Sequence, residues 1–140
     1  MAYLFRQKIS IEDLVEINSS RKKVLLYEPE NYLAGLYEHY LQQHNFDVKH
    51  CPHLAELKQS IKAFSPDLLI FNVENWDGKK KLLAFNFKRD FPLLPVISTG
   101  YNVNSEDLTA LMDYGIQSHI NRRATRPEDI AIIVKNVLQH

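Results

Sequence analysis

Side chains suited to phosphoryl or metal chemistry recur in this chain of 140 residues, at the ends of short apolar runs. They are Glu28 and Glu30 after the first run, Asn72 and Glu74 at the end of the third, Ser98 and Thr99 in the fourth, and Arg122 and Arg123 after the fifth. Carboxylates ligate Mg²⁺ and can attack phosphorus, and cations bind phosphoryl oxygens. Asn72 breaks the pattern, because a neutral amide has no comparable nucleophilicity.

These runs belong to a regular alternation of strands and helices. Apolar, β-rich stretches predict strands at 23–28, 46–51, 67–73, 94–99 and 118–121. Helical periodicity predicts helices at 31–44, 53–64, 77–91, 104–115 and from about 127 to 138. Strands that alternate with helices predict a parallel sheet with helices on both faces, and its functional side chains lie at the carboxyl ends of the strands.

Residues that favour helix ends support this assignment. Asp77 and Ser105 are expected to cap the helices that follow them, and Pro127 is expected in the first turn of the last helix. Pro92 and Gly115 are expected to end the helices that precede them.

Composition excludes several classes of protein. The 17 basic and 17 acidic residues give a formal net charge of +0, which argues against nucleic-acid binding through bulk charge. The single cysteine, Cys51, has no internal disulfide partner, and with no apolar run of membrane-spanning length we expect a cytoplasmic domain away from the membrane. His50, Cys51 and His53 lie close together but lack a second cluster of ligands, so no metal site is predicted.

Residues 1–21 precede the alternating unit, which spans residues 22–140. Within this N-terminal extension, Ser10 is a candidate cap for a short helix with Leu14, Val15 and Ile17 as its apolar residues. The extension is interpreted either as a terminus that packs or frays, or as a dimerisation or docking element.

The polar strand ends, together with the stretches FSPDLLIFN (64–72) and PVISTG (95–100) and with Gly115 seven residues before Arg122, give the sequence a recognisable pattern. Over residues 22–140 it resembles the receiver domain of bacterial two-component response regulators. The resemblance implies a flavodoxin-like, doubly wound, five-stranded parallel sheet, (β/α)5, with strand order 2-1-3-4-5.

The resemblance also assigns a role to each polar position. Asn72 takes the place of the phosphoacceptor aspartate, Glu28 and Pro29 the places of the acidic pair that holds Mg²⁺, and Glu30 lies just beyond. Thr99, with Ser98 beside it, keeps the strand-four hydroxyl; Arg122 and Arg123 replace a lysine and its following proline, and His119 takes the aromatic switch position. These departures indicate a non-enzymatic pseudo-receiver that needs no cofactor, with at most weak Mg²⁺ binding through Glu28 and Glu30.

Three functions follow. In the first, the domain signals through protein–protein contact or dimerisation without phosphorylation, using the face that residues 105–114, 118–121 and 126–139 form in such domains. In the second, the emptied pocket senses a small anion such as a nucleotide or phosphate, with Lys79, Lys80, Lys81, Arg122 and Arg123 as its basic residues. In the third, the domain is a conventional receiver in which Glu28, Glu30 and Glu74 sustain phosphorylation, with Glu74 as the only nearby acceptor candidate on the strand end that carries Asn72.

The helix at 77–91 adds one open question about partners. It carries Leu82, Leu83, Phe85, Phe87 and Phe91, more apolar surface than one core-facing stripe needs. This surface is either a wide core face or an exposed patch for a partner protein.

Overall fold

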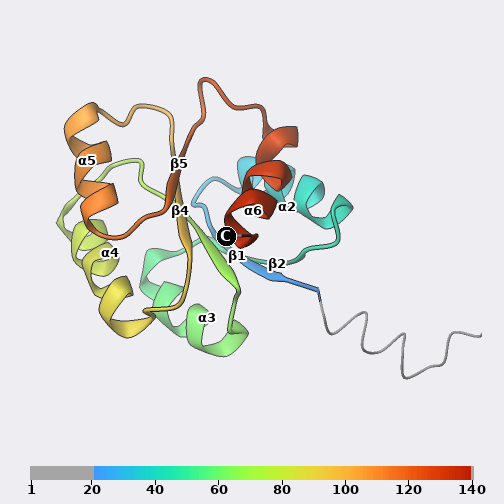
Figure 1. Ribbon diagram of the computed structural model, residues 1–140, viewed down its shortest axis with the longest axis horizontal. Helices are drawn as coiled ribbons and strands as arrows, with labels where there is room; N and C mark the ends of the chain where they lie inside the picture. Colours follow the sequence, from blue (N-terminus) through green and yellow to red (C-terminus); the bar gives the residue numbers. More distant parts are fainter. Residues whose placement is uncertain (1–20, 140) are drawn as a thin grey trace, which may run out of the picture.

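A five-stranded parallel sheet forms the centre of the structure, a computed structural model that describes residues 21–139 (Figure 1). Its strands are β1 (Lys23–Tyr27), β2 (Asp47–Cys51), β3 (Leu68–Asn72), β4 (Val96–Gly100) and β5 (Ser118–Asn121). They lie in the order β2-β1-β3-β4-β5. The flavodoxin-like fold and the predicted strand order are therefore confirmed.

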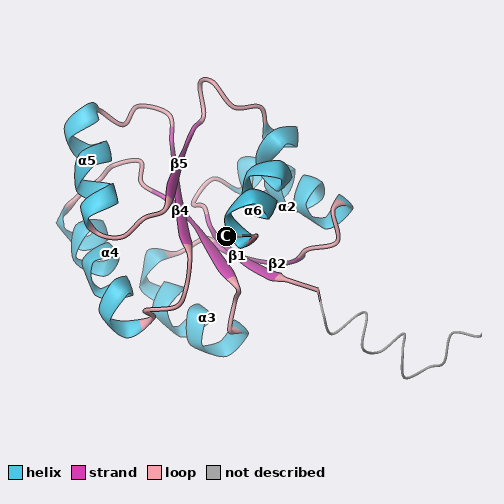
Figure 2. Cartoon of the chain, in the orientation of Figure 1, coloured by secondary structure: helices cyan, strands magenta, loops and turns pink. Residues whose placement is uncertain are grey.

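Helices cover both faces of this sheet (Figure 2). One face packs against α2 (Asn31–Gln43) and α6 (Ile130–Leu138), and the other against α3 (Leu57–Phe64), α4 (Gly78–Asp90) and α5 (Ser105–Asp113). Two single-turn 3₁₀ helices, η1 (Leu54–Glu56) and η2 (Pro127–Asp129), lead into α3 and α6.

The two-sided cover explains why the inner strands are apolar without interruption. Val24 and Leu26 pack on the α2–α6 side, whereas Leu25 and Tyr27 pack on the α3–α4–α5 side. Side chains alternate along a strand, so Glu28 follows Val24 and Leu26 on the α2–α6 side. Its carboxylate therefore lies on that side, at the carboxyl edge of the sheet.

Two helix starts differ from their predictions. Asn104, not Ser105, caps α5, and its side-chain oxygen accepts a hydrogen bond of 2.8 Å from the backbone N–H of Asp107. Both residue types are good caps, and the extended backbone at Asn104 decides between them. The predicted helix at 53–64 becomes a 3₁₀ turn followed by α3 from Leu57.

Other helix ends agree with the sequence. The carboxylate of Asp77 accepts a hydrogen bond of 3.0 Å from the N–H of Lys80 and caps α4. Gly115 follows α5 with φ +89°, a backbone angle that residues with a side chain rarely adopt.

The predicted N-terminal helix of residues 10–17 lies outside the described residues, as does residue 140. Among the helices in the described part of the chain, none is long and apolar enough to cross a membrane.

Replacing two glycines by alanine should shift stability in opposite directions. Gly115→Ala should lower the free energy of unfolding by about 1 kcal/mol, because an added Cβ disfavours positive φ. Gly35→Ala, inside α2 where an added Cβ meets no atom within 4 Å, should raise it by about 0.5–1 kcal/mol. Urea unfolding of both variants measures the two changes, and equal signs would contradict the assigned backbone geometry.

Candidate functional site at the carboxyl edge of the sheet

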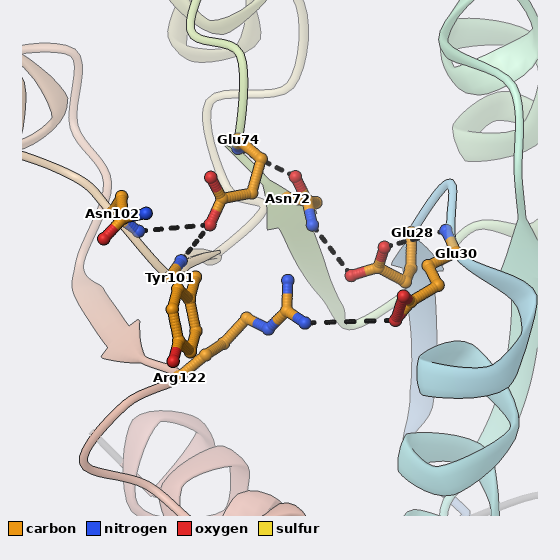
Figure 3. A network of polar contacts seen from close by, with 7 residues as sticks. All are labelled: Glu28, Glu30, Asn72, Glu74, Tyr101, Asn102 and Arg122. Carbon is orange, nitrogen blue, oxygen red and sulfur yellow. Dashed lines mark hydrogen bonds and ion pairs between the residues drawn. The ribbon is translucent and has the colours of Figure 1, made fainter.

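The carboxyl ends of β1, β3, β4 and β5 bring the predicted site residues to one edge of the sheet. Asn72 pairs with Thr99 in the register of β3 with β4. Glu28 directly follows β1, and Arg122 directly follows β5. Figure 3 shows the resulting polar network, in which Glu28 and Asn72 lie at its buried centre.

Asn72 and Glu28 are hydrogen-bonded to each other. The amide Nδ2 of Asn72 donates to Oε1 of Glu28 at 2.8 Å, and each residue is only 1% exposed. The second oxygen of Glu28 accepts from the backbone N–H of Glu30 at 2.9 Å. Oδ1 of Asn72 accepts from the backbone N–H of Glu74 at 2.8 Å. The buried carboxylate thus has a partner on each oxygen, which offsets the free-energy cost of removing it from water.

This arrangement offers few ligands to a Mg²⁺ ion. Both oxygens of Glu28 already accept hydrogen bonds, Pro29 offers no side-chain oxygen, and the carboxylate of Glu30 is exposed. Within residues 21–139, no three histidine, cysteine, aspartate or glutamate side chains come together in a way that suits a metal ion. A magnesium ion here would have to share the Glu28 oxygens with the hydrogen bonds from Asn72 and Glu30, and Pro29 and Asn72 add no second buried carboxylate.

Glu74 reaches from the end of β3 to the loop after β4. Its Oε1 accepts hydrogen bonds from the backbone N–H groups of Tyr101 and Asn102, the second at 3.3 Å (Figure 3). A carboxylate held by two N–H groups is a charge-assisted contact, which is stronger than one between neutral groups. Glu74 therefore ties two loops together.

Arg123 holds the same loop from the β5 side. Its Nε donates to the carbonyl oxygen of Tyr101 at 3.2 Å, and its guanidinium donates to Oδ1 of Asn102 at 2.6 Å. The guanidinium also lies 4.6 Å from the centre of the Tyr101 ring, within the range of a cation–π contact. The β4–α5 loop is therefore held on one side by the carboxylate of Glu74 and on the other by the guanidinium of Arg123.

Arg122 occupies the place that the resemblance gives to the lysine. Its guanidinium lies 3.9 Å from Oε1 of Glu30 across the mouth of the site (Figure 3). The Glu30 side chain is exposed, so this ion pair adds little to stability. The backbone N–H of Arg122 donates to the carbonyl of Gly100, which fixes the start of the β5–α6 loop beside β4.

The three consecutive lysines of α4 lie in different environments. Lys79 and Lys81 are exposed, whereas Lys80 is buried with its ammonium group donating to the carbonyl oxygen of Glu74 and 5.8 Å from the Tyr27 ring centre. Burial lowers the pKa of Lys80, and the nearby carboxylates of Asp77, Glu28 and Glu74 oppose that shift. Lys80 thus stabilises the β3–α4 loop.

His119 and Ser98 form a separate pair on the opposite face of the sheet from Asn72. Ser98 Oγ and His119 Nδ1 are 2.7 Å apart and hydrogen-bonded, with Ser98 fully buried. Burial lowers the pKa of His119, and the charge of Glu74 opposes this shift. His119 also borders a hollow of about 490 Å³ between β5 and α5, which Leu108 and Met112 help to line.

Other residues singled out in the sequence serve the fold. His50 Nε2 lies 2.7 Å from the backbone oxygen of Glu28, and the thiol of Cys51 donates to the carbonyl of His53 at 3.3 Å. On α4, Phe87 is buried while Leu82 and Phe85 are exposed, so the apolar residues of this helix are divided between the core and the molecular surface.

Solved structures resemble this fold closely. An orphan response regulator of H. pylori aligns with a TM-score of 0.75 at 18% identity, over 84% of this chain and 96% of that one. A response regulator from Thermotoga maritima aligns with a TM-score of 0.78 at 15% identity, over 86% and 99%. A CheY-like receiver domain protein from Methanospirillum hungatei aligns with a TM-score of 0.77 at 17% identity, over 86% and 95%. The chain has the receiver fold.

Sequence comparison adds no relative to these structures. No family model matches the chain, and no curated protein matches it. The receiver fold is thus recognised through its geometry, at sequence identities that establish the fold alone.

Sequence reasoning found the residues of the Asn72–Glu28 centre but not the loop contacts around it. Tyr101 and Asn102 take part mainly through backbone groups, and these leave no mark in a residue pattern. Within the described chain, Thr99 Oγ1 and Trp76 Nε1 are buried without a hydrogen-bond partner. The side-chain hydroxyl of Thr99, at this edge of the receiver fold, therefore makes no hydrogen bond to residues 21–139.

Restoring the acid at the end of β3 should destabilise this receiver fold. Asn72→Asp replaces the N–H donor to Glu28 by a second buried carboxylate, so we expect a loss of about 2 kcal/mol or more at pH 7 without divalent cations. The loss should shrink with millimolar Mg²⁺, because a divalent cation offsets the repulsion between the two carboxylates. Asn121→Asp is the matched control, because the exposed Asn121 contributes an oxygen acceptor that aspartate keeps. Equal losses for the two variants would contradict the assigned bond.

The His119–Ser98 pair should make stability depend on pH. The unfolded chain binds a proton at this histidine near its ordinary pKa of about 6.5, whereas the folded chain does so only at lower pH. Stability should therefore fall as the pH drops below about 6.5, and stop falling below the pKa of the folded state. His119→Gln should flatten this dependence, and His53→Gln, at an exposed position, should leave it unchanged. Urea unfolding between pH 5 and 8 measures it, and parallel curves for all three proteins would refute the assignment.

Proposed function

We propose that this chain is a signalling domain of receiver fold that contacts partner proteins without being phosphorylated. The observation that carries the proposal is the hydrogen bond from the Asn72 amide to the Glu28 carboxylate. The residue at the end of β3 is a donor to a buried acid, where transfer of a phosphoryl group would need an anionic nucleophile. The proposal therefore treats the site as a structural centre and assigns it no catalytic step.

The contacts of Glu74 support this proposal over phosphorylation at Glu74 itself. Its Oε1 is engaged by the N–H groups of Tyr101 and Asn102, so attack on a phosphodonor would first require the loss of both bonds. Held in this way, the carboxylate fixes the position of the β4–α5 loop without any added group. We infer that the protein thereby sets the conformation of this loop by itself.

The partner surface in this proposal is the face formed by α5, β5 and α6. Met112 on α5 and Ile132 on α6 are exposed there, and the hollow beside His119 opens between α5 and β5. Exposed apolar side chains next to a hollow are typical of protein-binding surfaces. The partner is a protein of a signalling pathway in the cytoplasm or a second copy of the chain, and the zero net charge gives no support to nucleic acid.

The alternative, a sensor of small anions, has weaker support. Thr99 Oγ1, buried and without a partner in the described chain, is the feature that favours it. Two of the five basic residues of such a site are engaged elsewhere, since Lys80 binds the Glu74 carbonyl and Arg123 binds the β4–α5 loop. Carboxylates from Glu28, Glu30 and Glu74 also surround the same edge and would repel an anion.

Exposure to a small phosphodonor should leave the chain chemically unchanged. After incubation with Mg²⁺ and acetyl phosphate, we expect an intact mass identical to that of the untreated chain, because Asn72 cannot accept a phosphoryl group. The oligomeric state, measured by sedimentation, should also be the same before and after treatment.

Glu74→Gln is the control for a different acceptor. A gain of one phosphoryl group by the unaltered chain would overturn the proposal. Loss of that gain in Glu74→Gln would then identify Glu74 as the acceptor, whereas its persistence would point to another carboxylate.

A further inference from the structure

A second hollow lies at the opposite, amino edge of the sheet, away from the site described above. It has a volume of about 500 Å³ and lies between the end of α3 and the loop from α4 to β4. Ile61 and Lys62 of α3 line one side, and Phe91, Leu93 and Leu94 line the other. Leu93 is 93% exposed, which makes it the most exposed large apolar side chain in the described chain. An apolar side chain so placed beside a hollow favours an apolar occupant.

The rim of this hollow carries a lysine that can pair with an acidic occupant. Asp67 also lines it, but its carboxylate accepts the backbone N–H of Lys23 at 2.7 Å. Asp90, next to Phe91, is paired with Lys58 at 3.3 Å and with Arg89 at 3.0 Å. Lys62, exposed on α3, has no ion-pair partner among residues 21–139, so its ammonium group is open to pairing with a carboxylate.

The first described strand, β1, begins beside this hollow. The N–H of Lys23 is bonded to Asp67, a residue of the hollow, and the ammonium group of Lys23 lies 3.4 Å from the carbonyl oxygen of Phe64 on α3. The backbone before Lys23 therefore starts beside the rim. Position 17 is six residues upstream of Lys23, and an extended chain of that length spans roughly 20 Å.

The sequence just upstream has the matching chemistry. Residues 10–17, SIEDLVEI, combine four apolar side chains with three carboxylates. The apolar residues are Ile11, Leu14, Val15 and Ile17, and the acids are Glu12, Asp13 and Glu16. We propose that the segment 10–17 docks in the amino-edge hollow of its own chain, with its apolar side chains on Leu93 and Phe91 and its carboxylates near Lys62.

The exposed apolar surface of α4 is a poorer match for this segment. Leu82 is 63% exposed and Phe85 is exposed beside it, both within the first half of α4. That half of α4 follows the carboxyl end of β3, at the far edge of the sheet from Lys23. The chain before β1 begins at the amino edge, so the hollow at that edge is the nearer of the two surfaces.

Hydrogen–deuterium exchange on the full-length chain tests this docking. Amides in residues 10–17 should exchange at least about tenfold more slowly than in a synthetic peptide of residues 1–20. Leu93→Ser should return them to the rate of the peptide, with unchanged protection of β3 as evidence that the fold is intact. Leu82→Ser removes an exposed leucine from α4 and is the matched control, which should keep the slow exchange.

Three results would overturn the proposal. The first is exchange at the peptide rate in the unaltered chain. The second is slow exchange that survives Leu93→Ser and is lost in Leu82→Ser, which would place the segment on α4. The third is slow amide exchange in residues 10–17 that becomes slower as the protein concentration rises. That result would mean that the hollow binds the segment of a second copy of the chain. None of these outcomes depends on whether the carboxyl-edge site is phosphorylated.

Discussion

The hydrogen bond between Asn72 and Glu28 is the contact around which the carboxyl edge of the sheet is organised. A glutamate that is 1% exposed needs compensation for its lost hydration, and in this chain an amide and a backbone N–H provide it. The same amide accepts the N–H of Glu74, which directs the chain out of β3. The start of the β3–α4 loop and the end of β1 therefore depend on a neutral donor at position 72.

Glu74 and Arg123 extend this order to the loop after β4. One holds the backbone N–H groups of Tyr101 and Asn102, and the other holds the Tyr101 carbonyl and the Asn102 side chain. Both residues are charged, and they come from the ends of β3 and β5, the two strands on either side of β4. Charge-assisted bonds of this kind are stronger than neutral ones, so the loop has little need of an external ligand to define its position.

The parts of this arrangement differ in how far the sequence could predict them. The uninterrupted apolar runs predicted buried parallel strands, and parallel strands bring Glu28, Asn72 and Arg122 to one edge, as the structure shows. The cap of α5 was misassigned to Ser105 because Asn104 beside it is an equally good cap, and only the backbone angles distinguish them. The burial of Lys80 and the loop contacts of Glu74 depend on backbone groups of other segments, which a residue pattern does not encode.

The separation of the two edges bears on how the protein can be regulated. At the carboxyl edge, charged groups are mostly paired within the protein, and the loop there is held from both sides. At the amino edge, Leu93 is exposed beside a hollow and Lys62 carries positive charge at its rim. An added segment can cover exposed apolar side chains and pair with a charge that lacks a partner. A network whose hydrogen bonds are already made gains little from a ligand. An added segment therefore has more to stabilise at the amino edge than at the Asn72–Glu28 centre.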